Sequence, residues 1–138
     1  MKLLFDTNIL LDVFQQRPHF YHGSSQLINM AEIGKINGCI SAISFNNCFY
    51  ILKRYCGNEK SRQTLQIMRD IFEVAALNSL IINQAIDSDI DDFEDAIQYF
   101  SAVHSKADYI ITRNQKDFKK SIIPAISPEE FLSTKKSL

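Results

Sequence analysis

The fold of this chain is constrained most by short apolar runs that alternate with longer segments of helical periodicity. The first run, Leu3–Leu4–Phe5, is apolar at consecutive positions, as in a strand buried on both faces. Further strands are predicted near residues 39–42, 74–77, 109–111 and 122–125. Because strands that alternate with helices form parallel sheets, the sequence predicts an α/β fold, a three-layer α/β/α sandwich around a central parallel sheet of about five strands.

Helices are expected between these strands, at 9–14, 25–33, 45–52, 59–72, 80–86 and 91–105, with a last one opened by Pro128. Asp6, Thr7 and Asn8 are residue types that favour a helix start, and Pro128 suits a first helical position. Pro124 predicts that the fifth strand lies at a sheet edge, because proline cannot donate a ladder hydrogen bond.

Length and composition indicate one folded domain. The chain has 138 residues, of which 46% are hydrophobic, so we predict a single domain over 1–138 with a frayed tail at about 134–138. Its three cysteines form no CxxC motif, and the odd count favours reduced thiols in a cytoplasmic protein over a disulfide framework. No run approaches the roughly 18–20 apolar residues of a membrane span, so no contact with a membrane is expected.

Charge is distributed unevenly along the chain. The net charge is −1, but six acids fall within residues 87–95, and the remainder of the chain carries +5. An acidic spot on a mildly basic body can bind a metal ion and still approach a polyanion. Basic residues that could contact phosphates are Lys53, Arg54, Lys60, Arg62, Arg69, Lys106, Arg113, Lys116, Lys119 and Lys120. The alternative is that these are ordinary solvated helix faces.

Three polar clusters are expected at the carboxyl edge of the predicted sheet, where open parallel sheets hold their active sites. They are Asp6-Thr7-Asn8 after the first strand, Asp92 and Asp95 at a helix start, and residues 112–117 after the fourth strand. Carboxylates gathered at one edge must take up protons or bind a cation, and oxygen ligands suit Mg²⁺ or Mn²⁺. Such an ion can activate water and hold a phosphate oxygen, which predicts phosphodiester hydrolysis.

Each cluster also has a purely structural explanation. Asp6 could cap the helix that follows it, and Asp117 could cap a short turn. Asp91 and Glu94 have the spacing of a capping box, and we assign both to structure. Asp92 and Asp95 would gain from the helix dipole without any active site. His19 and His22 have a spacing used in zinc sites but lack a third ligand nearby, and no glycine-rich phosphate loop is present.

With the three clusters in this order, the sequence resembles the PIN-domain family over nearly its whole length. The matching motifs are Leu4-Phe5-Asp6-Thr7-Asn8-Ile9-Leu10, Asp92-Phe93-Glu94-Asp95-Ala96 and the stretch from Tyr109 to Phe118. The resemblance implies a PIN-like sandwich and cleavage of RNA that depends on Mg²⁺ or Mn²⁺. It also implies a VapC-type toxin, dimeric and silenced by an antitoxin.

The resemblance assigns roles residue by residue. Asp6, Asp95 and Asp117 become the metal-holding catalytic acids, and Asp92 assists from the same helix turn. Asn8, Thr112 and Asn114 would orient ligands or water, and Arg113 and Lys116 would contact RNA. The family usually places a glutamate after its Ser/Thr motif, which here is Ser41–Asn47, and Asn47 stands in that place. Asparagine can coordinate through its carbonyl oxygen but brings no charge. Asn114 likewise stands where an acid is common.

Three functions remain open from the sequence. The first is a metal-dependent endoribonuclease, the toxin of a toxin–antitoxin pair. The second is a PIN fold that binds RNA or protein without cutting, which Asn47 favours. The third is a phosphatase of the haloacid-dehalogenase kind, although Asn8 stands where that class needs an acid, and a receiver domain lacks its lysine after the fourth strand.

Overall fold

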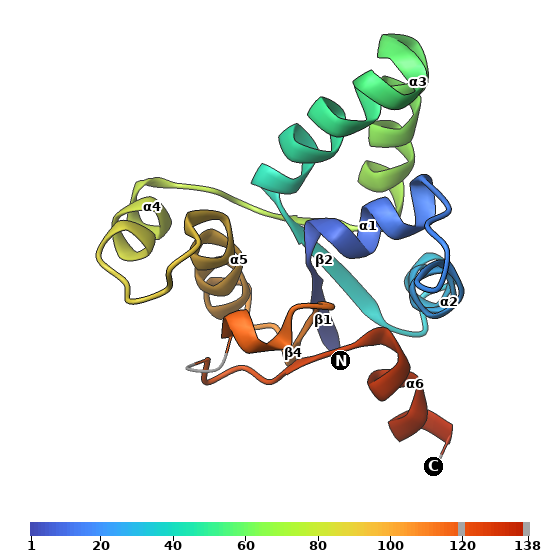
Figure 1. The fold of residues 1–138 in the computed structure, drawn as a ribbon. Helices are drawn as coiled ribbons and strands as arrows, with labels where there is room; N and C mark the ends of the chain where they lie inside the picture. The colour runs from blue at the N-terminus through green and yellow to red at the C-terminus, as the bar shows by residue number, and fades with distance from the viewer. Residues whose placement is uncertain (119–120, 137–138) are drawn as a thin grey trace.

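Five parallel strands form one sheet in the computed structural model, which describes residues 1–118 and 121–136 (Figure 1). The strands are β1 (Lys2–Phe5), β2 (Asn37–Ser41), β3 (Glu73–Ala75), β4 (Tyr109–Ile111) and β5 (Ala125–Ile126). Their order is β3-β2-β1-β4-β5, and every neighbouring pair is parallel. β1 therefore lies at the centre, with Leu4 paired to Cys39 on one side and to Ile110 on the other. The predicted α/β fold is confirmed.

Helices cover both faces of this sheet. They are α1 (Thr7–Phe14), α2 (Tyr21–Glu32), α3 (Ala42–Ile71), α4 (Ser79–Ile86), α5 (Phe93–His104) and α6 (Pro128–Lys136), with a short 3-10 helix η1 (Gln115–Phe118). Helices α1, α2, α3 and α6 pack together on one face, whereas α5 covers the other face and α4 packs against α5 (Figure 1).

The side chains of β1 alternate between the two faces of the sheet, which explains this layering. Leu3 and Phe5 are fully buried on the face of α1, α2 and α3, where Phe5 contacts Phe72 with ring centroids 5.2 Å apart. Leu4 is fully buried on the opposite face, among side chains that include Ala102 of α5. A strand buried on both faces has no solvent side, which is why the run is apolar at every position.

Several element boundaries differ from the expected ones. The two helices expected at 45–52 and 59–72 form the two arms of α3, joined at Gly57, whose φ of 85° and ψ of 174° lie outside the helical region. The third strand covers 73–75 and the fifth 125–126, where Ile110 N donates to Pro124 O at 2.9 Å and Thr112 N to Ile126 O at 3.0 Å. β5 is an edge strand, as predicted from Pro124. Helix α6 extends to Lys136, and positions 137–138 of the tail expected to fray lie outside the described residues.

Cys39, Cys48 and Cys56 are free thiols. Within residues 1–118 and 121–136, every helix is too short or too polar to cross a membrane.

Candidate functional site

Asp6 lies at the carboxyl end of the central strand, and its side chain is held from the neighbouring one. The residue is only 3% exposed. Thr112, directly after β4, donates from Oγ1 to Asp6 Oδ2 at 2.9 Å, and the backbone N of Asp6 donates to Ile111 O at 2.9 Å. Asp6 occupies the N-cap position of α1, yet its side chain makes no capping hydrogen bond. The structure therefore does not support the capping explanation for this carboxylate.

Burial makes the Asp6 carboxylate costly to ionise. Burial raises the pKa of Asp6 to about 6, against the stabilising hydrogen bond from Thr112, and the negative charge of Glu94 adds to the increase. A carboxylate that is kept buried at such a cost, among polar groups at the carboxyl end of the central strand, marks a candidate functional site.

Helix α5 brings a second carboxyl group to this edge. Asp92 is its N-cap, and Asp92 Oδ1 accepts from the backbone N of Asp95 at 2.9 Å. The expected cap at Asp91 was therefore wrong by one position, and the expected helix start by two. Burial raises the pKa of Asp95 to about 7, and the charges of Asp92, Asp6, Asp117 and Glu94 raise it further. The carboxyl groups expected to share a site are thus close enough to repel one another.

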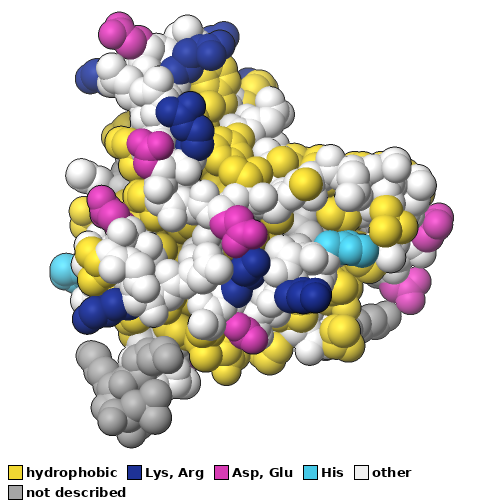
Figure 2. Space-filling model, turned by 180° about the vertical axis from the view of Figure 1, so that it is seen from behind, with side chains coloured by type: hydrophobic (Ala, Val, Ile, Leu, Met, Phe, Trp, Pro, Cys, Tyr) yellow, Lys and Arg dark blue, Asp and Glu magenta, His cyan; other side chains and the backbone are white. Residues whose placement is uncertain are grey.

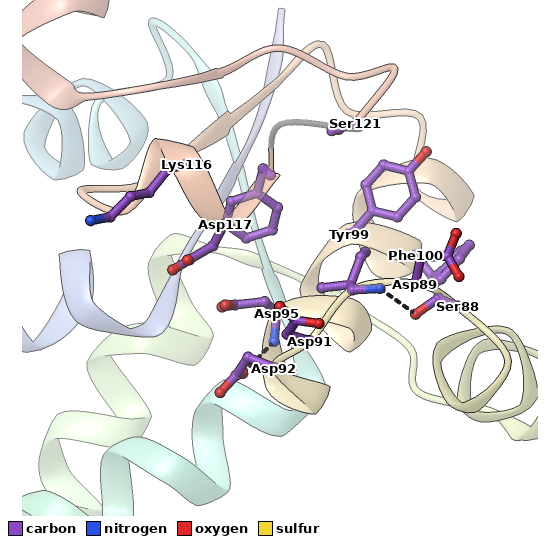
Figure 3. Close-up of a pocket in the computed structure, with 12 residues that line it drawn as sticks. Ser88, Asp89, Asp91, Asp92, Asp95, Tyr99, Phe100, Lys116, Asp117 and Ser121 are labelled. Atoms are coloured by element: carbon purple, nitrogen blue, oxygen red, sulfur yellow. Dashed lines mark hydrogen bonds between the residues drawn. The ribbon is translucent and has the colours of Figure 1, made fainter.

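Asp117 approaches from the third predicted cluster. It lies exposed on η1, and Asn114 starts this turn by accepting from the backbone N of Asp117 at 3.0 Å. A cavity of about 620 Å³ separates η1 from the start of α5 (Figure 3). Its polar lining includes Asp92, Asp95, Lys116 and Asp117, and Figure 3 shows the carboxylates of Asp95 and Asp117 directed toward the same space.

These side chains suit a hard divalent cation. The donors are all oxygens. Burial is the largest cause of the raised pKa values of Asp6 and Asp95, and neighbouring negative charges, which a cation would neutralise, raise them further. Among the described residues, no three His, Cys, Asp or Glu side chains converge tightly enough to form a complete metal site on their own. His19 and His22, considered above for a zinc site, likewise have no third ligand grouped with them among the described residues. An ion at Asp95 and Asp117 would therefore draw these carboxylates together and complete its shell with water or substrate oxygens, as Mg²⁺ commonly does.

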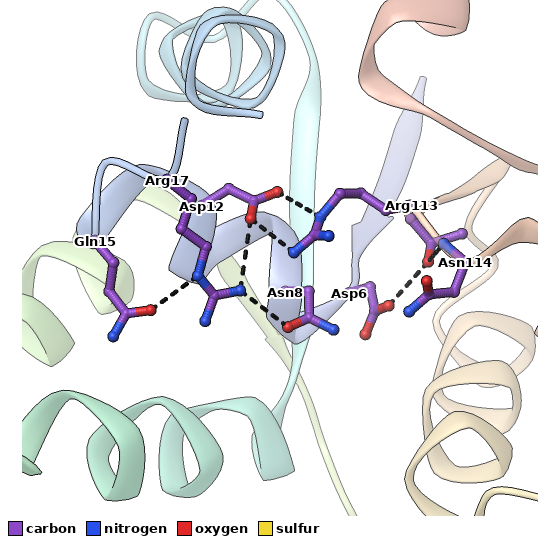
Figure 4. A network of polar contacts seen from close by, with 8 residues as sticks. Asp6, Asn8, Asp12, Gln15, Arg17, Arg113 and Asn114 are labelled. Atoms are coloured by element: carbon purple, nitrogen blue, oxygen red, sulfur yellow. Dashed lines mark hydrogen bonds and ion pairs between the residues drawn. The ribbon is translucent and has the colours of Figure 1, made fainter. Parts of the chain in front are cut away.

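A buried ion pair braces the loop after β4 (Figure 4). Asp12 of α1 is fully buried, and its two carboxylate oxygens accept from Nε and Nη2 of Arg113, both at 2.9 Å. Arg17 Nη1 lies 3.6 Å from Asp12 Oδ1 and donates to Asn8 Oδ1 at 3.3 Å. The guanidinium of Arg113 also stacks on Phe20 at 4.0 Å from the ring centroid. Arg113 is thus held inside this network and fixes the position of its neighbour, Thr112.

A second polar network lies on the other side of Asp6. Thr7 Oγ1 donates to Glu94 Oε1 at 3.0 Å and lies 2.9 Å from Ser44 Oγ of α3. The amide nitrogen of Gln98 donates to both hydroxyls, at 3.2 and 3.0 Å. Glu94, which we had assigned to a capping box, therefore turns inward. Asn47 lies half-buried one helical turn after Ser44.

Sequence reasoning missed Asp12 and Glu94 as members of these networks. Asp12 interrupts an apolar helical run, Ile9 to Phe14, which signals a buried charge that needs a partner. No local sequence pattern could identify that partner as Arg113, which lies 101 positions away in the sequence. Glu94 was concealed because its spacing from Asp91 matches a capping box, although Asp92 makes the cap.

Basic and aromatic side chains gather on the outer part of α3 (Figure 2). Arg54 stacks on Tyr50 at 4.5 Å and hydrogen-bonds to its hydroxyl, and Arg62 lies 5.6 Å from the ring centroid of Phe49. Lys53, Lys60 and Arg69 are exposed on the same helix. This surface carries the positive charge expected of a polyanion contact.

Comparison with known proteins identifies relatives of this arrangement. A family model described as PIN domain matches residues 2–116. Ribonuclease VapC1 of Aquifex aeolicus (strain VF5) is 24% identical over 135 residues, covering 94% of this chain and 92% of that protein. A chain of a toxin-antitoxin complex from Klebsiella pneumoniae has a similar structure with a TM-score of 0.69 at 25% identity, covering 91% of this chain and 97% of that one. A chain of VapBC2 from Rickettsia felis, in a complex with promoter DNA, has a TM-score of 0.68 at 18% identity, covering 92% and 98%.

Proposed function

This chain belongs to the PIN domain family, and on that premise we propose that it is an endoribonuclease that hydrolyses RNA phosphodiester bonds with a bound Mg²⁺ or Mn²⁺. The observation that carries the proposal is that Asp95 and Asp117, from two separate elements, line one cavity, and that the negative charge of Asp6, at the end of β1, contributes to the raised pKa of Asp95. The relative named as a ribonuclease supports the reaction class.

Each carboxylate has a distinct position in the proposed reaction. Asp6, Asp95 and Asp117 would hold the cation, with Asp92 assisting through the oxygen that does not cap α5. The bound ion would supply positive charge for the phosphate and lower the pKa of an attacking water. Thr112 keeps Asp6 in one orientation, so the carboxylate is in place before substrate arrives. Asn8, in the first turn of α1, and Asn114, in the loop after β4, would orient ligands or water.

Substrate contact is proposed for the cations that face solvent. Lys116 lines the cavity beside Asp117 and is exposed, which suits a contact with a phosphate next to the scissile one. Arg113 remains a predicted RNA contact, but its Nε and Nη2 are committed to Asp12 and only its outer side can face RNA. The basic surface of α3 would hold a more distant part of the strand.

The structural neighbours support a protein partner. Two of them come from toxin–antitoxin complexes, and we propose that this chain is likewise a toxin that an antitoxin silences. We further propose that it works in the cytoplasm, as a homodimer and as one domain over its 138 residues. Its free cysteines and its lack of a membrane-spanning helix in the described residues are compatible with that location.

A second candidate function is favoured by Asn47. An uncharged side chain at this position of α3 reduces the negative charge available to a cation. On that basis the alternative is a PIN fold that binds RNA or protein without cutting.

An RNA cleavage assay separates the two functions. Purified protein, free of antitoxin, is incubated with a mixed RNA substrate in Mn²⁺, in Mg²⁺ or in EDTA. Cleavage is expected with either metal, none in EDTA, and a loss of about 100-fold or more in Asp6→Asn and Asp95→Asn. Asp70→Asn, which changes an acid on α3 whose side chain is 74% exposed, serves as the matched control. Folded protein that retains RNA affinity but never cuts would establish the binding module instead.

A further inference from the structure

Glu94 is turned toward the interior although the three residues before it face solvent. Asp91, Asp92 and Phe93 are exposed, whereas Glu94 is partly buried and its Oε1 accepts from Thr7 Oγ1 at 3.0 Å. Thr7 directly follows Asp6, so this hydrogen bond fixes the Glu94 carboxylate beside the central acid of the site. A residue that served only the helix dipole would have no need of a partner on α1.

The charge of Glu94 acts on three different elements. It contributes to the raised pKa of Asp6 after β1 and of Asp95 on α5. It also raises the pKa of Cys48 on α3, second only to the effect of burial. Together with the hydrogen bond from Thr7, these effects place the Glu94 carboxylate near Asp6, Asp95 and Cys48.

That face of α3 includes position 47. Ser44, Asn47 and Cys48 share one side of the helix, because residues three and four apart are neighbours on a helix surface. Ser44 Oγ lies 2.9 Å from Thr7 Oγ1, the group that holds Glu94. Asn47 thus lies one helical turn after Ser44, which contacts the threonine that holds Glu94.

The surrounding network has more acceptors than donors. Within the part of the chain that the structure describes, no lysine or arginine lies within 4.0 Å of the Glu94 carboxylate. The buried amide oxygen of Gln98, whose nitrogen donates to Thr7 and Ser44, has no hydrogen-bond partner there. An uncompensated carboxylate beside Asp6 and Asp95 is what a bound cation would stabilise.

We propose that Glu94 is a further acid of this metal site, positioned by Thr7 to supply from α5 the negative charge that Asn47 does not supply from α3. The inference rests on the proposed metal-dependent function. It implies that the site keeps a full set of acids despite Asn47, so that asparagine at this position is compatible with metal binding.

Mn²⁺ affinity, measured by calorimetry and by the loss of the free-ion EPR signal, tests this directly. Glu94→Gln keeps an acceptor for Thr7 and removes only the charge, and its Kd for Mn²⁺ is expected to rise about 10–100-fold. Adding Asn47→Glu to that variant is expected to restore most of the affinity. The same Asn47→Glu change should have a much smaller effect when Glu94 is intact. Glu59→Gln, an exposed glutamate on α3, is the matched control and should bind as the unchanged protein does.

The outcomes separate this inference from the function on which it rests. If Asp6→Asn weakens Mn²⁺ binding but Glu94→Gln stays within about twofold of the unchanged protein, Glu94 has no role toward the metal. If Glu94→Gln binds Mn²⁺ weakly and adding Asn47→Glu to that variant does not restore the affinity, the proposal that Glu94 supplies the charge missing at Asn47 is overturned. If Asp6→Asn also binds normally, the metal site itself is wrong. Circular dichroism of each variant confirms that the fold is retained. A large gain in Mn²⁺ affinity from Asn47→Glu alone would also contradict the proposal, because Glu94 would then not be supplying the missing charge.

Discussion

At the scale of single residues, the stability of the site depends on the buried Asp12–Arg113 pair. Asp12→Asn leaves the volume nearly unchanged but removes the charge that Arg113 and Arg17 share. We expect the free energy of unfolding to fall by about 2–4 kcal/mol, because a partly buried guanidinium loses its partner. Urea denaturation measures this change. Asp70→Asn breaks an exposed pair with Arg69 at 3.7 Å and should cost below about 0.5 kcal/mol, so equal effects in the two variants would contradict the assignment.

The residues of the site divide into those that a local pattern reveals and those that it does not. Asp6 and Thr112 follow buried strands directly, so topology alone brings them to the same edge, and their 2.9 Å contact agrees with that expectation. Asp12 and Glu94 depend on where a helix face points once packed. A one-position change in the cap of α5, from Asp91 to Asp92, leaves Glu94 free to turn toward Thr7, and no sequence rule fixes a cap that finely.

At the scale of elements, the bend of α3 depends on Gly57. Its φ of 85° is a left-handed conformation that glycine adopts freely and that a Cβ makes costly. Gly57→Ala is expected to lower the free energy of unfolding by about 1–3 kcal/mol, and Gly57→Asn by a similar amount, because a φ of 85° with a ψ of 174° lies in a region that essentially only glycine occupies. Thermal denaturation of the two variants measures the loss. A more stable Gly57→Ala protein would mean that α3 can run straight through position 57.

The same element shows how far periodicity predicts structure. The two apolar stripes of α3 were expected as separate helices, and the glycine between them does interrupt the helical geometry. Their mutual arrangement, with the second arm returning to place Met68 and Phe72 in the core beside Phe5, is a tertiary property. Short strands at the edge of a sheet are harder to predict from sequence. β5 has only two residues, and its position follows from pairing with β4 more than from its own sequence.

At the scale of the whole molecule, the site carboxylates make stability depend on pH. Asp6 and Asp95 have an ordinary pKa of 3.8 when unfolded, and the fold raises these values to about 6 and about 7. Between these limits the folded protein binds more protons than the unfolded chain, so in EDTA the free energy of unfolding should fall as pH rises from about 4 to about 7. Below pH 4 both states are protonated, and the penalty is absent.

Asp95→Asn isolates one part of this pH dependence, since its amide stays neutral throughout. In EDTA at pH 8 the variant should melt about 3–8 °C higher than the unchanged protein, whereas at pH 4 the two should melt together, because the penalty exists only where Asp95 is ionised. Saturating Mn²⁺ should reverse the order at pH 8, since the ion stabilises only the protein that keeps the full set of acids. Asp70→Asn should follow the unchanged protein in every condition. If Asp95→Asn raised the melting temperature equally at both pH values, its effect would come from packing, and the carboxylates would not be held together against their own repulsion.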